Sequence, residues 1–343
     1  MVKRYLIAII VLFVLTVGHA HAQNNDRQEI RIVGSQAVLT LMHVLSEAFA
    51  QHFDHDPPAI IVTGAGGGFD LFCQSVGFDT PDINASSRPI APAELELCQS
   101  NGVTKITEIA IGRAAFVVAT AGEAPQMALS AAQLHSAIAA RVIQDGQIIQ
   151  NPYENLRDID PLLPDQPIRF MGPAAGTPDF DAFIELVLNR GCRQSLQELN
   201  LAQSEQARFC TLPRTDRTFR YGERDQNARL QWLLKRPKAF GFINFTLYDE
   251  NRGRLHAAVL DGEAPSRESI ATGRYALSRP IYLYIKSSHI PAIEGLQQFL
   301  YEATSERAIG PEGYLVEKGL LSLDDRGRNR ARELAFSLES LVQ

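Results

Sequence analysis

The sequence predicts an α/β protein whose sheets are largely parallel. At three places a β-rich apolar stretch passes through a short loop of small residues into a segment with helical apolar spacing. Strands that alternate with helices along a chain are typical of layered α/β folds with parallel strands. The three junctions are IRIV-GSQA at 30–37, IIVT-GAGGG at 60–68 and IRFM-GPAAGT at 168–177.

Each junction is followed by apolar residues at the spacing of an amphipathic helix. After the third junction this helix is expected to end near Gly191. Further strands are predicted over 115–119, 239–245 and 280–285, and Pro-bearing loops separate the elements. The apolar positions after the three junctions are, in order, Leu41, Met42, Leu45, Ala48 and Phe49; Phe69, Phe72 and Val76; and Phe180, Phe183, Ile184, Val187 and Leu188.

Residues 1–22 have the layout of a secretory signal peptide. Lys3 and Arg4 precede an apolar run, and Ala20 and Ala22 form an A-x-A pattern. The run is shorter than the roughly 20 apolar residues that span a bilayer, so we expect cleavage before Gln23 rather than an uncleaved anchor. No later stretch is predicted to span a membrane, so the mature protein is expected to be exported and soluble.

Size and charge limit the possible partners. Without the leader about 321 residues remain, enough for two lobes of ordinary domain size. The formal net charge of −6 becomes about −8 when Lys3 and Arg4 are removed. An acidic chain argues against nucleic acid or an anionic membrane as a partner, so any anion site must be local.

The four cysteines predict two disulfides in an exported protein. They permit three connectivities, and we expect the neighbour pairs Cys73–Cys98 and Cys192–Cys210, one in each lobe. Loops of this size contribute roughly 3 kcal/mol each. No cysteine has the C-x-x-C or nearby histidine spacing that zinc favours, so neither a metal nor another cofactor is expected.

The junction loops are candidates for an oxyanion site. A helix start carries unpaired N–H groups and a partial positive charge, and small side chains let an anion approach. Any one junction taken alone is more often an ordinary turn, whereas three together favour a site. The stretch DINASSR at 82–88 adds two hydroxyls and a guanidinium, which suit a tetrahedral oxyanion unless the stretch is only a capped surface turn. Arg113 and the cluster RTDRTFRYGERD at 214–225 are further charged candidates.

Other chemistries receive little support. The loop at 64–68 lacks the Lys-Ser/Thr pair of a P-loop and the acidic residue of a dinucleotide fingerprint. No base can be assigned to Ser35, Ser86 or Ser87 from spacing, and none of them lies in a G-x-S-x-G motif. The sequence therefore predicts a binding protein rather than an enzyme.

Taken in order, these motifs resemble PstS-like periplasmic phosphate-binding proteins of ABC transporters. The resemblance runs from about Ile30 to the segment GYLVEKGL at 313–320. It implies a type II periplasmic-binding-protein fold, with two α/β lobes joined by hinge strands and an interlobe ligand cleft. Lobe 1 is expected to comprise 23–114 and 271–343, and lobe 2 to comprise 115–270. The motifs are GSQAV, TGAGGGFDLFC, PDINASSRPI, ELELC, MGPAAGTPDFDAF, RTDRTFRYGE, RPKAFGFINF and SRPIYLYIK.

The resemblance also implies which residues bind the ligand. Arg88 is expected to be the principal cationic ligand, with hydroxyl donors at Ser35, Ser87 and Thr177. The full set implied by the family motifs is Ser35, Gln36, Ala37, Gly64, Ala65, Gly66, Gly67, Ser87, Arg88, Gly176 and Thr177.

Several ligand positions depart from the family pattern. The family has Ser-Thr where Gln36-Ala37 stands and hydroxyls where Ala65 and Ala175 stand, and some members have charged residues at Met171 and Pro173. Each hydrogen bond to a charged ligand contributes roughly 1.5–3 kcal/mol, so these changes imply weaker binding or another oxyanion.

A family carboxylate is also missing near Ala114, which predicts only a weak preference for phosphate over sulfate. Asp179 and Asp216 are the alternative sources of such an acceptor.

The function implied is that of a non-enzymatic, monomeric, periplasmic solute-binding protein. It would deliver phosphate or a related inorganic oxyanion to an ABC permease in the inner membrane by hinge closure. The alternative is a fold-sharing protein with a degenerate anion site that acts as a sensor or partner-binding module. A periplasmic hydrolase is a third, less supported hypothesis.

Overall fold

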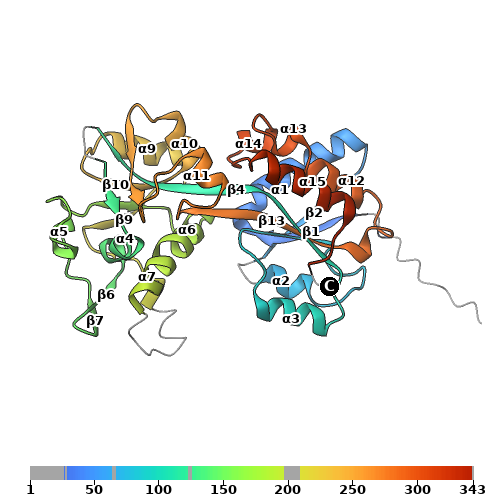
Figure 1. Cartoon of the computed structure of the whole chain (residues 1–343), viewed down its shortest axis with the longest axis horizontal. Coiled ribbons are helices and arrows are strands. Elements are labelled where there is room, and N and C mark those ends of the chain that lie inside the picture. Colours follow the sequence, from blue (N-terminus) through green and yellow to red (C-terminus); the bar gives the residue numbers. More distant parts are fainter. Residues whose placement is uncertain (1–26, 28, 64–66, 123–125, 197–208, 342–343) are drawn as a thin grey trace, which may run out of the picture.

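The protein, seen in a computed structural model that describes residues 27, 29–63, 67–122, 126–196 and 209–341, consists of two α/β lobes. Two long antiparallel strands, β4 (Ile106–Ala121) and β13 (Ser278–Lys286), run between them (Figure 1). The lobe drawn mostly in blue and red, called the first lobe, contains the first and last residues that the structure describes, and the middle of the chain forms the second lobe. The expected two-lobe fold is confirmed.

The first lobe is built on three parallel strands. Their small-residue loops and helices follow the predicted strand–loop–helix order. Helices α1 and α12 pack against this sheet and share a core that includes Ile32, Phe49 and Phe299. Besides β4 and β13, its elements are β1 (Arg31–Ser35), α1 (Gln36–Phe53), β2 (Ala59–Thr63), α2 (Gly67–Phe72), β3 (Ile83–Ser86), α3 (Pro92–Ser100), η3 (Ser287–His289), α12 (Leu296–Ala303), α13 (Glu306–Ile309), α14 (Tyr314–Glu317) and α15 (Asp325–Ser337).

The other lobe is built from the middle of the chain around a core rich in aromatic rings. Phe170, Phe183 and Phe219 contact one another there, with ring centroids about 6 Å apart. Its elements are β5 (Ala128–Leu129), α4 (Ala131–Ile138), β6 (Arg141–Gln144), β7 (Gln147–Gln150), α5 (Leu156–Ile159), β8 (Phe170–Gly172), α6 (Pro178–Phe183), η1 (Ile184–Asn189), α7 (Arg190–Ser195), β9 (Phe219–Tyr221), α9 (Gln226–Leu234), β10 (Phe240–Asn244), α10 (Phe245–Glu250), β11 (Leu255–Ala257), β12 (Val259–Leu260) and α11 (Arg267–Ala271).

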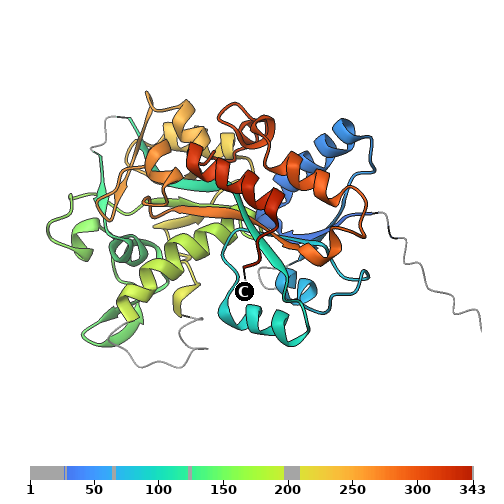
Figure 2. The same ribbon diagram turned by 45° about the vertical axis from the view of Figure 1, so that its right-hand side comes forward.

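One continuous sheet passes through both lobes in the order β2-β1-β3-β13-β4-β10-β8-β9. The pairs β1–β2, β1–β3, β8–β10 and β8–β9 are parallel, whereas every pair that includes β4 or β13 is antiparallel. In the turned view of Figure 2, helix α15, drawn in red, lies close to β4. The strands predicted at 115–119 and 280–285 are thus parts of the two long connecting strands.

Hydrophobic contacts divide β4 and the segment around β13 between the lobes. Ile111 and Ile281 belong to the core of the first lobe, whereas Ala115 and Leu277 belong to the core of the second. We propose that the connecting segments lie at 112–114 and 278–280. Relative to the limits predicted from the sequence, this division assigns 271–277 to the second lobe, because Tyr275, Ala276 and Leu277 pack in its core.

Gly191 does not end the helix that follows the third junction. The helical run continues through η1 and α7 to Ser195. A Cβ atom on Gly191 would lie 2.2 Å from the carbonyl oxygen of Ala131, so this glycine permits close contact between α7 and α4. Conversely, α2 ends at Phe72, before the predicted helical position Val76, which is 48% exposed.

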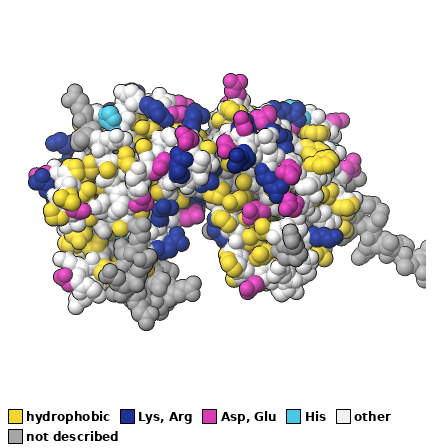
Figure 3. Space-filling model, viewed as in Figure 1, with side chains coloured by type: hydrophobic (Ala, Val, Ile, Leu, Met, Phe, Trp, Pro, Cys, Tyr) yellow, Lys and Arg dark blue, Asp and Glu magenta, His cyan; other side chains and the backbone are white. Residues whose placement is uncertain are grey.

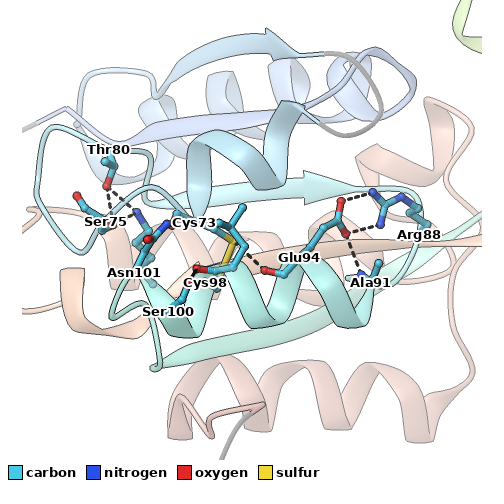
Figure 4. Close-up of a disulfide and its surroundings, with 11 residues drawn as sticks. Cys73, Ser75, Thr80, Arg88, Ala91, Glu94, Cys98, Ser100 and Asn101 are labelled. Atoms are coloured by element: carbon cyan, nitrogen blue, oxygen red, sulfur yellow. Dashed lines mark hydrogen bonds and ion pairs between the residues drawn. A yellow bond between two sulfur atoms is a disulfide. The ribbon is translucent and has the colours of Figure 1, made fainter.

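Both predicted disulfides are present. Cys73, just after α2, is bonded to Cys98 of α3 (Figure 4), and Cys192 of α7 is bonded to Cys210. The prediction of neighbour pairing, with one bridge in each lobe, is therefore confirmed. Within the described ranges no helix is long and apolar enough to cross a membrane, and the predicted signal peptide lies outside those ranges.

Candidate functional site

The predicted ligand residues that the structure describes lie at strand ends or in the loops and helix starts that follow them. Ser35 ends β1 and Ser87-Arg88 follows β3, and these strands are parallel neighbours, so the two groups lie at the same sheet edge. In the second lobe the loop after β8 leads into α6, which lies close to α1 of the first lobe. Figure 3 shows a hollow between the lobes with Lys and Arg side chains along its walls.

The first loop contributes a helix start and a hydroxyl. Ser35 occupies the N-cap position of α1, yet its side chain makes no capping hydrogen bond. Its Oγ atom is buried and has no hydrogen-bond partner within the described part of the chain. Gln36 and Ala37 form the first turn, so their backbone N–H groups belong to the positive end of the helix dipole. A buried hydroxyl next to these groups is suited to an anion.

The second loop lies mostly outside the described residues, as Gly64, Ala65 and Gly66 are not among them. Gly67 begins α2 directly after this loop. A Cβ atom on Gly68 would lie 2.4 Å from Oδ1 of Asn84, so this glycine permits close approach of α2 to β3.

Arg88 is held in place by its neighbours on the first lobe. Its Nη1 and Nη2 atoms donate to the two carboxylate oxygens of Glu94 at 2.7 and 2.5 Å (Figure 4). Its guanidinium lies 5.2 Å from the ring centroid of Phe69. The hydrogen bonds that Arg88 donates to Glu94 raise the pKa of Arg88. Although burial opposes it, pairing with Arg88 and the Ala91 N–H lowers the pKa of Glu94, so both groups are ionised at neutral pH.

The serines beside Arg88 have different roles. Ser86 Oγ donates to the carbonyl oxygen of Arg88 at 2.8 Å and accepts from its N–H at 3.2 Å, which shapes the turn. Ser87 is buried at this turn. Of the two hydroxyls predicted from this stretch, that of Ser86 is therefore committed to the backbone.

The third loop presents the start of α6. Thr177 is the N-cap residue, and its Oγ1 atom donates to the carbonyl oxygen of Ala174 at 2.6 Å and accepts from the N–H of Phe180 at 3.3 Å. Gly176 has φ +68°, the left-handed region that favours glycine. Because the hydroxyl of Thr177 is engaged within the loop, backbone N–H groups are the donors this loop best offers.

Three charged residues near the cleft were not predicted from the sequence. Arg279 of β13 is 6% exposed at its side chain and donates to Glu185 of η1 at 3.1 Å. Asp181 lies one helical turn before Glu185, and the charge of Arg279 acts on it. Burial raises the pKa of Asp181, an effect that Arg279 opposes. Glu185 also acts electrostatically on Arg88 of the first lobe, so these groups lie where the two lobes face each other.

The other charged candidates have structural partners. Arg113 lies on β4 between the lobes, where its Nη2 atom donates to Ser278 Oγ at 3.2 Å and burial lowers its pKa. In the cluster at 214–225, Arg214 is buried and donates to Asp216 at 2.8 Å and to the carbonyl oxygen of Tyr153 at 2.6 Å. Asp216 is thus bound within the second lobe, whereas Asp179, at the start of α6, adjoins the third loop.

Two α/β lobes, two connecting antiparallel strands and a hollow with Lys and Arg side chains along its walls are the architecture of a bilobal binding protein. The profile of the PBP superfamily domain matches residues 19–307, and the chain belongs to this family. The prediction of a binding protein rather than an enzyme is consistent with that membership.

Relatives and solved structures support the predicted resemblance to PstS-like proteins. The chain is 26% identical over 285 residues to protein SphX of Synechococcus elongatus, which covers 81% of this chain and 73% of SphX. It is 22% identical over 278 residues to the phosphate-binding protein PstS of Staphylococcus saprophyticus, and the aligned residues cover 79% of this chain and 74% of that protein. The crystal structure of a possible phosphate binding protein from Planctomyces limnophilus has a TM-score of 0.69 at 20% sequence identity, and the superposition covers 90% of this chain and 98% of that one.

Proposed function

We propose that this chain is a periplasmic solute-binding protein of an ABC importer that binds phosphate or a related inorganic oxyanion between its lobes. Its partners would be the oxyanion and an ABC permease of the inner membrane, and it would act as a monomer. Export through a cleaved leader agrees with the two disulfides, which persist in oxidising compartments. Named phosphate-binding proteins among its relatives support the choice of ligand.

The observation that carries this proposal is the convergence of anion-binding elements from both lobes. The start of α1, with the unpartnered Ser35 hydroxyl, lies on one lobe beside Ser87 and Arg88. The start of α6 lies on the other lobe and close to α1. An anion between them would accept hydrogen bonds from both lobes and would stabilise their closed arrangement.

Isothermal titration calorimetry with phosphate, arsenate, sulfate and phosphonates tests the proposal. We expect saturable binding of at least one of these anions at a stoichiometry of one. Binding of none of them would contradict the proposed function.

Replacement of Arg88 by Ala is expected to weaken binding of that anion at least about tenfold. A guanidinium that donates charge-assisted hydrogen bonds contributes roughly 1.5–3 kcal/mol, and Arg88 adjoins the first-lobe donors. The dissociation constant from calorimetry measures the effect. Arg31→Ala is the matched control, because Arg31 lies at the opposite end of β1 from Ser35. An unchanged dissociation constant for Arg88→Ala would place the site elsewhere.

Phosphate is expected to bind about tenfold to a hundredfold more tightly than sulfate through the carboxylate of Asp181. The weak preference predicted from the sequence assumes that no carboxylate adjoins the anion, but Asp181 lies on the side of α6 that is near Arg279. A carboxylate accepts a hydrogen bond from protonated phosphate and repels sulfate, which carries no proton at neutral pH. One such bond is worth roughly 1.5–3 kcal/mol.

The ratio of the two dissociation constants, measured for the parent and for Asp181→Asn, checks this expectation. The substitution removes the charge that repels sulfate, so the ratio should approach one. Asp165→Asn is the control, because Asp165 is an exposed carboxylate of the same lobe. Equal binding of both anions by the parent would show that Asp181 does not contact the ligand.

A specific observation supports the second candidate function, that of a sensor or partner-binding module. Arg88 is already paired with Glu94, and Arg279 with Glu185, so the two cations bring little net charge to an anion. A calorimetry panel without binding, together with a gene that lies apart from permease and ATPase genes, would favour this alternative.

A further inference from the structure

Arg229 is a buried arginine of the second lobe whose pairing is incomplete. Its side chain lies on α9 and is 1% exposed. Nη2 donates to Oδ2 of Asp179, and Nη1 donates to the carbonyl oxygen of Phe242 at 3.3 Å. Nε is buried and has no hydrogen-bond partner among the described residues. A buried cation with an unused donor is costly, so its retention calls for a role besides packing.

Arg214 of the same lobe shows what a fully paired buried arginine looks like. Its side chain is 3% exposed, and its Nε and Nη2 atoms both contact Asp216, at 2.8 and 2.7 Å. Nη1 donates to the carbonyl oxygens of Tyr153 and Ala137 at 2.6 and 3.4 Å. All three side-chain nitrogen atoms of Arg214 have hydrogen-bond partners, whereas Nε of Arg229 has none among the described residues.

Arg229 lies next to Met171, the middle residue of strand β8 that precedes the third loop. A Cβ atom placed on Gly222 would be 3.1 Å from Cδ of Arg229 and 3.1 Å from Cγ of Met171, so the two side chains are neighbours. That Cβ atom would also lie 2.6 Å from the carbonyl oxygen of Gly172. Only a glycine at position 222 therefore permits the close approach of these three residues. Some PstS-like proteins have a charged residue where this chain has Met171.

Asp179 connects Arg229 to the start of α6. It is two residues after the N-cap Thr177, and its Oδ2 atom also accepts from Nε2 of Gln226 at 2.6 Å. Gln226 in turn accepts from the N–H of Asn244 at the end of β10. Gln226 and Arg229, both on α9, therefore donate to the carboxylate of Asp179, and this carboxylate orients the guanidinium of Arg229. The group lies at the sheet edge where anions bind in α/β folds.

We propose that Arg229 supplies the positive charge of the second-lobe half of the oxyanion site, from α9, in place of a charged residue at position 171. Asp179 acts as its positioning residue. This inference rests on the proposed function, because it assigns a residue to the same site.

Calorimetry with inorganic phosphate, arsenate and sulfate on the full chain tests the assignment. Arg229→Met is expected to weaken binding at least about tenfold, the loss of one charge-assisted contact. Addition of Met171→Arg to that variant is expected to restore affinity to within about threefold of the parent, because it returns a guanidinium to the third loop. Arg214→Met is the control: it should lower the melting temperature while the folded protein keeps the parent affinity.

The outcomes separate this inference from the function on which it rests. If the parent binds an anion and folded Arg229→Met binds it within twofold, or if the double variant fails to recover affinity, the role of Arg229 is overturned and the function stands. If the parent binds none of the anions, both are overturned. Should Arg229→Met not fold, Arg229→Gln removes the charge but keeps a polar side chain that can donate to Asp179, and affinity within twofold of the parent there would also overturn the assignment.

Discussion

Replacement of Asp82 by Ala is expected to lower the free energy of unfolding by about 3–5 kcal/mol. Its carboxylate is fully buried in the first lobe. Arg27 Nη2 donates to Oδ1 of Asp82 at 2.5 Å, and the N–H of Arg31 donates to Oδ2 at 2.8 Å. Nδ1 of His289 lies 2.6 Å from Oδ1. Removal of the carboxylate leaves buried polar groups and a cation without their acceptor, which is the costly way to break such a cluster.

The same carboxylate also acts on a buried lysine. Nζ of Lys286 donates to the carbonyl oxygen of Ser75 at 2.8 Å and to Oγ1 of Thr80 at 2.6 Å. Burial lowers the pKa of Lys286 to about 8, and the charge of Asp82 opposes that shift. Asp82 precedes β3 and Lys286 ends β13, so the cluster joins segments about 200 residues apart in sequence.

Urea denaturation at pH 7, followed by circular dichroism, measures the effect. Asp70→Ala is the matched control, because Asp70 is an exposed carboxylate in the first turn of α2 and contributes at most about 1 kcal/mol. A loss for Asp82→Ala no larger than that of the control would show that the buried cluster does not stabilise the lobe.

The fold was largely predictable because its repeating unit is local. Each strand, small-residue loop and helix is read within about 20 residues, and the alternation of these units predicts parallel sheets. The length of β4 was not predictable, because its two halves pack in different cores and its partner β13 lies more than 160 residues away. Gly191 misled the prediction because glycine marks both a helix end and a close helix contact.

The candidate site was predictable only where its residues are adjacent in sequence. Ser87-Arg88 could be recognised as a pair of donors in one turn. The partners of the other cations are distant in the chain: Arg229 pairs with a residue 50 positions away, and Arg279 with one 94 positions away. A single arginine in a strand or helix gives no signal of such a partner, so only the folded chain reveals these pairs.

The free energy of unfolding is expected to fall with pH between about 7.5 and 4, and His135 accounts for about 3 kcal/mol of that decrease. His135 is 1% exposed on α4, packs near Phe209 and has a buried Nε2 atom without a partner among the described residues. Burial lowers the pKa of His135 from 6.5 to about 4. Over this range the unfolded chain binds a proton that the folded protein does not bind, so a lower pH favours unfolding.

The measurement is urea denaturation at pH 7.5, 6, 5 and 4 for the parent and for His135→Leu. The variant cannot take up the proton on unfolding, so its stability should decrease by about 3 kcal/mol less than that of the parent over this range. His256→Leu is the matched control, because it makes the same replacement at an exposed histidine of the same lobe. Parallel profiles for the parent and His135→Leu would mean that His135 is protonated in the folded protein, and its burial would then require a partner for that charge.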